Sequence, residues 1–296
     1  MSIFCNFALI CKNTISTAML TLNCKGKIIS LEKPLIMGII NATPDSFFEG
    51  HLHISQEKIL EKVEKMVQEG ADMIDIGGQS TRPGSKRVSL EDEIQRVIPY
   101  INFVHKNFPD TIISVDTYYS KVASLAVDSG ASIVNDISSG NFDREMIPTV
   151  GKMKVPYICM HMQGTPETMQ ENPVYQNVTN EVINFFIKKT DECKKANIKD
   201  IIIDPGFGFG KTIPHNFKLL KDLQALKILN LPILAGLSRK GMIYKTLGTS
   251  AESALNGTTV LNTLALNNGA SILRVHDVKE AKETITLFEQ YKNATL

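Results

Sequence analysis

The phrase EGADMIDIGG, residues 69–78, recurs in altered form as SGASIVNDIS at residues 129–138 and as NGASILRVHD at residues 268–277. In each phrase a helical pattern ends in Gly-Ala, and a short apolar run with a polar end follows. The glycine suits the left-handed conformation that closes a helix, since it has no Cβ to clash. The alanine leaves room for the helix to pack closely on the strand that follows. The three phrases therefore predict a repeated helix–strand unit.

Helical periodicity is visible in the segments that separate these strands. The first segment has Ser55 available as its N-cap, and its apolar stripe consists of Ile59, Leu60, Val63, Met66 and Val67. The second segment, residues 89–106, has the stripe Ile94, Val97, Ile98, Ile101 and Val104. One apolar stripe with polar residues elsewhere is typical of a helix that covers a core.

Eight short runs are apolar without alternation: LIMGII (35–40), MIDI (73–76), TIISV (111–115), SIVN (132–135), VPYICM (155–160), DIIID (200–204), LPILAG (231–236) and SILRV (271–275). Strands that are apolar on both faces belong to a parallel sheet covered by helices. Eight of them, alternating with helices, predict an α/β fold of the (β/α)8 TIM-barrel type in a single domain. The alternative is a doubly wound open sheet, but that fold usually carries a glycine fingerprint after its first strand, where IINATPDSF stands here.

The start of the chain falls into two parts. Residues 20–29, LTLNCKGKII, place Gly26 between two β-like runs, which predicts a hairpin that closes the floor of the barrel. Residues 1–18 lack the basic lead and the cleavage site of a signal peptide. Translation could begin at the first residue or at Met19, and both starts stay open. We therefore expect residues 1–18 to be a dispensable extension and residues 19–296 to form the barrel domain.

Composition narrows the possible partners and the compartment. The formal net charge is +1 at pH 7 and the basic residues are spread along the chain, which argues against nucleic acid and against a membrane surface as partners. No run approaches the ~20 apolar residues that a membrane helix needs. The five cysteines form no C-x-x-C pair, and an odd number of scattered thiols is typical of the reducing cytoplasm.

The stretch IIIDPGFGFGKT, residues 201–212, looks at first like a phosphate-binding glycine loop. A Walker-type loop needs a glycine five places before Gly210, but Pro205 stands there. The dinucleotide fingerprint needs its third glycine at the position of Lys211. Neither pattern fits, so these glycines must serve another purpose.

In a barrel of this type the functional site lies at the C-terminal ends of the strands. The polar or sulfur-bearing residues there are Asn41, Thr81, Arg82, Asp116, Asn135, Asp136, Met160, His161, Asp204, Ser238, Lys240, Arg274 and His276. Asp136, and Asp45 in the first loop, have an alternative interpretation as caps of turns or helices.

The chemistry of these residues divides in two. Asp116, Asn135 and Asp204 could hold a flat, nitrogen-rich heterocycle through its N–H edge, with Lys240 offsetting the cost of burying the carboxylates. The donors suited to phosphate oxygens are Thr81, Arg82, Arg274 and His276. Asn41 offers a neutral oxygen to a hard cation such as Mg²⁺, which takes few protein ligands and completes its shell with phosphates and water.

Taken in order, eight motifs resemble the dihydropteroate synthase family of pterin-binding enzymes, from about residue 35 to residue 278. The motifs are MGIINATPDSF (37–47), DIGGQSTRPGS (75–85), SVDTYYSKVA (114–123), IVNDIS (133–138), MHMQGTPETMQ (160–170), DPGFGFGKT (204–212), GLSRK (236–240) and RVHDV (274–278). They span nearly the whole barrel, and the set is highly specific.

The resemblance implies an enzyme that joins 6-hydroxymethyl-7,8-dihydropterin diphosphate to p-aminobenzoate and releases diphosphate, with Mg²⁺ as cofactor and a homodimer as the assembly. The implied pterin pocket consists of Asp116, Asn135, Met160, Asp204, Phe209, Gly236, Lys240 and Arg274. The implied catalytic residues among them are Asp116, Asp204, Lys240 and Arg274. The implied diphosphate site consists of Asn41, Thr81, Arg82, Arg274 and His276, with Asn41 also as the metal ligand. The implied p-aminobenzoate site consists of Phe47, Pro83 and Ser238.

Two alternatives remain at this point. A methyltetrahydrofolate-dependent methyltransferase shares the barrel, although SRK (238–240) and RVH (274–276) favour the synthase, because a diphosphate needs a cationic wall. A non-catalytic paralogue would bind pterins without turnover. The chain departs from the family pattern at Ala42, FFEGH (47–51), Gln79 and Gly241, and the altered first loop leaves its closure and the sensitivity to sulfonamides open.

A chain that starts at Met19 should keep the turnover and the thermal stability of the 296-residue chain, because residues 1–18 match no part of the barrel. Thermal unfolding and a steady-state assay of the two forms check this. A melting temperature several degrees lower in the shorter form would show that the extension packs on the barrel.

Overall fold

The computed structural model describes residues 20–42, 56–79, 85 and 87–294. The expected features that lie outside these residues are the extension 1–18, the caps Asp45 and Ser55, and the candidate site residues Phe47, Thr81, Arg82 and Pro83. No helix within the described ranges is long and apolar enough to span a bilayer.

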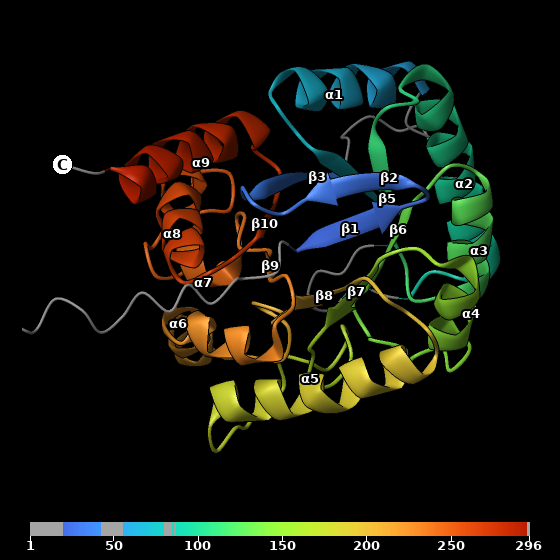
Figure 1. Cartoon of the computed structure of the whole chain (residues 1–296). Coiled ribbons are helices and arrows are strands. Elements are labelled where there is room, and N and C mark those ends of the chain that lie inside the picture. The colour runs from blue at the N-terminus through green and yellow to red at the C-terminus, as the bar shows by residue number, and fades with distance from the viewer. Residues whose placement is uncertain (1–19, 43–55, 80–84, 86, 295–296) are drawn as a thin grey trace, which may run out of the picture.

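A ring of eight parallel strands forms the centre of the fold (Figure 1). In chain order the strands are β3 (Leu35–Asn41), β4 (Met73–Gly77), β5 (Ile112–Asp116), β6 (Ile133–Asp136), β7 (Tyr157–Met160), β8 (Ile201–Asp204), β9 (Leu234–Ala235) and β10 (Ile272–Val275). From β3 to β8 each strand pairs with the next, and β10 pairs with both β3 and β9. A parallel bridge between Ile203 and Ile233 joins β8 to the start of β9. The predicted barrel is confirmed, and the open sheet is excluded.

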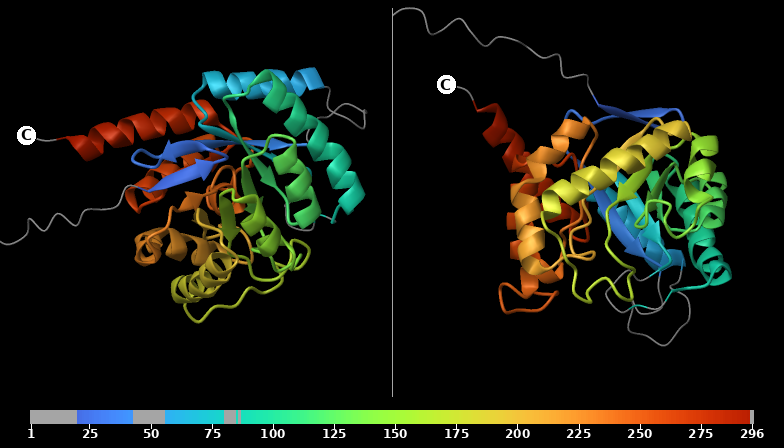
Figure 2. Two further views of the ribbon diagram at one scale, coloured as in Figure 1. Left: turned by 45° about the vertical axis from the view of Figure 1, so that its right-hand side comes forward. Right: turned by 90° about the horizontal axis from the view of Figure 1, so that it is seen from below.

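Helices surround the strands (Figures 1 and 2). They are α1 (Gln56–Gln68), α2 (Leu90–Asn107), α3 (Ser120–Asp128), α4 (Met146–Met153), α5 (Val178–Lys195), α6 (Ile213–Lys221), the 3-10 helix η2 (Leu223–Leu229), α7 (Gly241–Tyr244), α8 (Leu255–Asn267) and α9 (Val278–Asn293). Ser89 caps α2, since its side chain accepts a hydrogen bond from the amide of Asp92. Gly70, Gly130 and Gly269 follow helices with φ of 98°, 120° and 103°, which is the left-handed conformation predicted for them.

The two faces of the strands belong to two different cores. Outward side chains such as Ile36, Ile74 and Ile113 join the large cluster beneath the helices. Inward side chains near the strand starts form a second cluster, here called the floor: Leu35, Met37, Met73, Ile112, Ile133, Ile158, Ile202, Leu234 and Ile272. Burying one such side chain contributes about 1.5–3 kcal/mol. The floor is therefore a stable base on which the rest of the barrel interior rests.

An antiparallel hairpin covers the floor from outside. Its strands are β1 (Thr21–Cys24) and β2 (Lys27–Ser30). Lys25 and Gly26 make the turn with φ of 54° and 93°, and two consecutive positive φ values are what a type I′ hairpin turn needs. Leu22 and Cys24 point into the floor cluster, and Figure 2 shows the hairpin at one end of the barrel. The predicted closing hairpin is confirmed.

Candidate active site

The site begins one step above the floor. Side chains alternate along a strand, so the residue two places after each floor residue also points inward. Counting in this way gives a second layer, here called the polar layer: Ile39, Asp75, Ser114, Asn135, Met160, Asp204, Gly236 and Arg274. The next step gives Asn41, Gly77, Asp116 and His276 at the mouth. Most of the predicted site residues thus lie in two adjacent layers at the C-terminal ends of the strands.

Arg274 joins two carboxylates across the barrel, and one of them also binds Asn135. Its Nε and Nη2 lie 2.7 Å from Oδ2 of Asp75, and Nη2 also lies 2.7 Å from Oδ2 of Asp116. Asn135 donates from Nδ2 to the same Asp75 oxygen at 2.9 Å. Burial raises the pKa of Asp116 to about 7, because the favourable charge of Arg274 only partly opposes the desolvation and Asp75 adds repulsion. Asp116 is therefore poised between its two protonation states near neutral pH.

Asp204 and Lys240 face each other across a glycine. A Cβ built on Gly236 would lie 3.8 Å from Nζ of Lys240 and 3.9 Å from Oδ2 of Asp204, so the missing side chain keeps the space between the two charges open. Burial raises the pKa of Asp204, while Lys240 and the amide of Gly206 oppose the rise. Burial likewise lowers the pKa of Lys240 to about 8, while Asp204 opposes the fall. The two groups are close enough to influence each other's pKa, but Nζ of Lys240 donates its hydrogen bond to the carbonyl oxygen of Phe207.

The glycines after Asp204 serve a close approach of two loops. Gly206, Gly208 and Gly210 all have positive φ, at 67°, 82° and 60°. A Cβ on Gly206 would lie 1.9 Å from the carbonyl oxygen of His161, and a Cβ on Gly210 would lie 2.3 Å from that of Gln163. No side chain larger than hydrogen fits at these two positions. The stretch is therefore a packing loop of the site and not a nucleotide loop.

Lys211 locks the two loops together from inside. Its Nζ lies 2.9 Å from Nδ1 of His161 and donates to the carbonyl oxygens of Gly206 at 2.9 Å and Phe209 at 3.1 Å. Burial lowers the pKa of Lys211 to about 7 and that of His161 to about 2, so the imidazole is neutral and can accept the hydrogen bond. Lys211 was missed at the sequence level, and a lysine inside a glycine-rich run is the only signal for it.

Apolar side chains form one wall at the mouth. Met160 and Phe209, two predicted pterin residues, cluster with Tyr118, Ile137 and Met169. Nζ of Lys240 lies 4.7 Å from the centroid of the Phe209 ring, a cation–π distance. A flat ring that lies between this wall and Arg274 can be stacked on one side and bonded at its edge.

Ser238 and His276 form a separate pair at the mouth. Oγ of Ser238 lies 3.0 Å from Nδ1 of His276, and Ser238 is buried. Partial desolvation of the ring and the charge of Arg274 lower the pKa of His276 to about 4, even though the residue remains exposed to solvent. The imidazole is therefore neutral at pH 7. The hydroxyl of Ser238, predicted to contact p-aminobenzoate, is engaged by this ring.

Arg239 fixes the segment between Ser238 and Lys240. Its Nε and Nη2 each lie 2.9 Å from a carboxylate oxygen of Asp277, and its backbone is left-handed, with φ of 54°. A bidentate ion pair can hold a residue in this strained conformation. By fixing the backbone at Arg239, the ion pair helps to orient the side chains of the neighbouring Ser238 and Lys240.

Asp136 belongs to the fold and not to the site. Its carboxylate accepts hydrogen bonds from the amides of Ser138 and Gly140, both at 2.7 Å, and from the hydroxyl of Tyr157 at 2.8 Å. It lies on the outward face of β6, one place after the inward Asn135. The alternative interpretation of Asp136 as a turn cap is the correct one.

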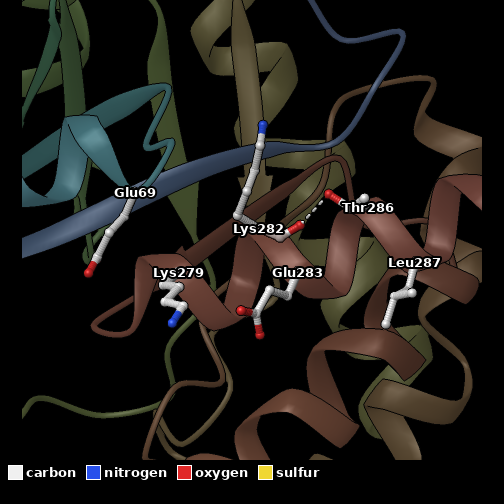
Figure 3. A pocket seen from close by; sticks show the side chains of 6 residues that line it. All are labelled: Glu69, Lys279, Lys282, Glu283, Thr286 and Leu287. Atoms are coloured by element: carbon white, nitrogen blue, oxygen red, sulfur yellow. Dashed lines mark hydrogen bonds between the residues drawn. The ribbon is translucent and has the colours of Figure 1, made fainter.

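A groove on the outside of the barrel lies away from the strand ends (Figure 3). It is lined by Glu69, Lys279, Lys282, Glu283, Thr286 and Leu287. Glu69 follows the end of α1, and the other five residues lie on α9. Alternating charges on a helix face are typical of a solvated surface, so the chemistry is assigned to the barrel mouth.

The barrel and the polar layer define a class of enzyme. Residues 37–276 match the family of pterin binding enzymes. The dihydropteroate synthase of Haemophilus influenzae is 42% identical over 270 residues, which cover 90% of this chain and 98% of that protein. The Yersinia pestis dihydropteroate synthase, solved with a sulfonamide drug complex, superposes with a TM-score of 0.88 at 37% identity and covers 93% of this chain and 100% of that one. The Xanthomonas albilineans enzyme, solved with 4-aminobenzoic acid, superposes with a TM-score of 0.87 at 37% identity and covers 94% and 100%.

The chain therefore belongs to the dihydropteroate synthase family, a family of transferases in folate biosynthesis. The predicted family, fold and enzyme class are confirmed, and the methyltransferase alternative is set aside. The roles of individual site residues remain predictions.

Replacing Gly206 by alanine should lower the free energy of unfolding by more than the left-handed backbone alone explains. Gly248 is a matched control, because its φ is 65° and a Cβ there would meet nothing within 4 Å. Gly248→Ala should lose about 1–2 kcal/mol from backbone strain. Gly206→Ala should lose about 1–3 kcal/mol more, because the new methyl group meets the oxygen of His161. Urea unfolding of both variants measures the difference, and equal losses would contradict the close approach.

Proposed function

We propose that this chain condenses 6-hydroxymethyl-7,8-dihydropterin diphosphate with p-aminobenzoate to give 7,8-dihydropteroate and diphosphate. The observation that carries the proposal is the convergence of Asp116, Asn135, Asp204, Lys240 and Arg274 on one mouth of the barrel. The relatives solved with 4-aminobenzoic acid and with a sulfonamide support an aromatic amine as the second substrate. Sulfonamides are expected to compete with that amine here as well.

The pterin is recognised by its hydrogen-bonding edge and by its faces. Asp204 can accept from two adjacent N–H groups of the ring, since its Oδ2 faces the space beside Gly236. Asn135 and Asp116 accept from the opposite side, while Lys240 donates to a ring acceptor. Met160 and Phe209 supply the apolar wall. Burial deprives each carboxylate of the water molecules that would donate hydrogen bonds to it. The N–H groups of the ring replace these donors, so the site selects a nitrogen-rich ring.

The reaction needs charge stabilisation at two places. Diphosphate leaves from a carbon attached to an electron-rich ring, so positive charge develops on the pterin and negative charge on the leaving group. Asp116 and Asp204 stabilise the first. Arg274 and His276 line the side on which the second departs, together with Thr81 and Arg82 of the second loop. The arylamine is the nucleophile, and therefore no side chain has to attack.

Magnesium is proposed as a cation that arrives with the diphosphate. The part of the chain that the structure describes holds no cluster of three His, Cys, Asp or Glu side chains able to bind a metal by itself. Asn41 ends β3 next to β4, where the amide of Ala42 donates to Gly77 at 2.7 Å, and one neutral oxygen at this point fits a cation that phosphates also hold. When bound, Mg²⁺ neutralises part of the charge on the leaving group.

A coupled assay tests the proposed function. The purified chain is mixed with pterin diphosphate, p-aminobenzoate and Mg²⁺, and the release of diphosphate and the formation of dihydropteroate are followed. Equal amounts of the two products are expected. Pterin binding without turnover would identify the non-catalytic alternative, and turnover that survives removal of divalent cations would remove the magnesium proposal.

Replacing Asp204 by asparagine should weaken pterin binding without unfolding the protein. An amide cannot accept from two ring donors as a carboxylate does, and loss of a charge-assisted contact costs ~1.5–3 kcal/mol, or roughly 10- to 150-fold in Kd. Asp200→Asn is the control, because Asp200 lies at the other end of the same strand, where it contacts the amide of Asn23. Calorimetry should show the loss only for Asp204→Asn, and a Kd within twofold of wild type would remove the assignment.

The homodimer is proposed to form through α8 and α9. These helices pack side by side, and their outer surfaces expose Val260 and Leu264 on α8 and Leu287 and Tyr291 on α9. Two pairs at i and i+4 make continuous apolar stripes, and exposed patches of this kind mark interfaces.

Leu264→Glu should therefore convert a dimer into a monomer of 32.8 kDa, because the charge would be buried without a partner at the interface. Ile187→Glu is the control, since Ile187 on α5 is about as exposed, at 52% against 44% for Leu264, but lies outside the proposed face. Light scattering measures the mass of each. A monomeric wild type, or a dimer that tolerates the glutamate, would contradict the interface.

The proposal also covers the cellular compartment of the protein and the role of its first 18 residues. We place the protein in the reducing cytoplasm, where Cys24, Cys159 and Cys193, all buried as free thiols, remain reduced. Residues 1–18 are proposed to be dispensable for the reaction.

A further inference from the structure

Asp75 is a buried charge to which the reaction above gives no task. It lies in the middle of β4 with its side chain in the polar layer, and none of its surface is exposed. One of its oxygens, Oδ2, accepts hydrogen bonds from Nε of Arg274 and from Nδ2 of Asn135, and it forms an ion pair with Nη2 of Arg274 at 2.7 Å. We propose that Asp75 is a positioning residue that aims Arg274 and Asn135 at the pterin, an inference that rests on the function proposed above.

Stability does not explain this carboxylate. Its other oxygen, Oδ1, is buried and has no hydrogen-bond partner among the residues that the structure describes. A buried ion pair is often no more stabilising than apolar side chains of the same volume, and an unsatisfied buried oxygen makes it worse. The pair as a whole therefore does little for the fold that apolar side chains would not do, and the unsatisfied oxygen calls for a reason outside the fold.

The geometry supplies that reason for Asn135. A side-chain amide has a donor end and an acceptor end. Because Asp75 binds the Nδ2 end at 2.9 Å, Oδ1 of Asn135 is the end left to accept an N–H group from a ligand. Without the carboxylate the amide could turn over and present its donor to the ring, which would repel the same N–H edge.

The geometry gives a second reason at Arg274. Nε and Nη2 form one edge of the guanidinium, and both lie 2.7 Å from the same oxygen of Asp75. Two contacts from one edge fix the plane of a guanidinium as well as its place. The opposite corner, Nη1, lies outside these contacts and points away from Asp75. If Asp116 were the only partner of Arg274, the guanidinium would stay in place but its plane could rotate.

Asp75 also acts on the protonation of Asp116. The charged groups that act electrostatically on Asp116 are Arg274 from β10, Asp75 from β4, Glu93 from α2, Asp136 from β6 and Lys240 from the segment after β9. Burial is the largest cause that raises the pKa of Asp116, and like-charge repulsion by Asp75 is the next cause that raises it. Removing the charge of Asp75 should therefore lower that pKa from about 7. Packing alone would not produce such a change.

Asp75→Asn is the test, with Asn262→Ala as its control. Asn262 lies on α8 outside the two site layers, is also buried, and its Oδ1 likewise has no partner among the described residues. Asp75→Asn should raise the Kd for pterin diphosphate by roughly 10- to 100-fold at an unchanged melting temperature. In the pH profile of kcat/KM, its acidic limb should move to lower pH. Asn262→Ala should leave the Kd and the pH profile as in wild type.

A double-mutant cycle separates positioning from a general effect. If Asp75 acts through Arg274, then adding Asp75→Asn to Arg274→Met should change the Kd much less than it changes that of wild type. Asp75→Glu keeps the charge and should return the acidic limb toward its wild-type position. Additive effects of the two substitutions would overturn the proposal. So would an Asp75→Asn variant that loses affinity only together with a lower melting temperature and leaves the acidic limb of the pH profile in place. Wild-type turnover is measured in parallel, so that failure of the proposed function is recognised separately.

Discussion

The constraint on which this structure depends is the two-residue period of its parallel strands. Each strand sends alternate side chains inward, so successive inward positions, two residues apart on every strand, fill the barrel interior in layers. The first layer is apolar and forms the floor. The second layer sits two residues further on and holds Asp75, Asn135, Asp204 and Arg274. A ligand site at this depth needs no loop to define it, because strand geometry alone brings together residues that are up to 199 positions apart in the chain.

The contents of these layers create an electrostatic problem that only a ligand resolves. Three carboxylates, those of Asp75, Asp116 and Asp204, face the two cations of Arg274 and Lys240. Desolvation moves the pKa of Asp116 up to about 7 and that of Lys240 down to about 8. In the free site both groups are therefore close to the pH at which they lose their charge. A ring rich in N–H groups supplies the missing donors and favours the charged forms. In the proposed reaction the same carboxylates would stabilise positive charge that develops on the ring, so recognition and catalysis would use one set of interactions.

The sequence alone predicted the parts of this arrangement that local patterns encode. The eight apolar runs, the Gly-Ala helix ends and the hairpin around Gly26 each follow from neighbouring residues, and all were found. Asp75 was missed because a run such as MIDI does not show which of its residues point inward; this becomes clear only when Met73 is known to lie in the floor. Lys211 was missed for a related reason, since its partners His161 and Gly206 meet it only through the close packing of two loops. The hydroxyl of Ser238 bonds to His276, a contact between strands that no spacing in the sequence encodes. The roles of Phe47, Thr81, Arg82 and Pro83 rest on the family resemblance, because these residues lie outside the described part of the chain.

The proposed reaction uses no side-chain nucleophile, and the placement of the site residues on strands and on fixed loops suits such a reaction. A side chain that attacks must move and change its bonding, whereas a group that stabilises charge works best when it cannot move. Asp75, Asn135, Asp204 and Arg274 stand on strands above a packed floor, and Phe209 stands on a loop that Lys211 and two close-packed glycines hold in place. Lys240 follows Arg239, whose backbone is fixed by the ion pair with Asp277. Each charge is thus oriented before the substrate arrives. The left-handed backbone of Arg239 and the unsatisfied oxygen of Asp75 cost the fold some stability. In the proposed reaction this fixed arrangement would keep the electrostatic field of the site constant while the new bond forms.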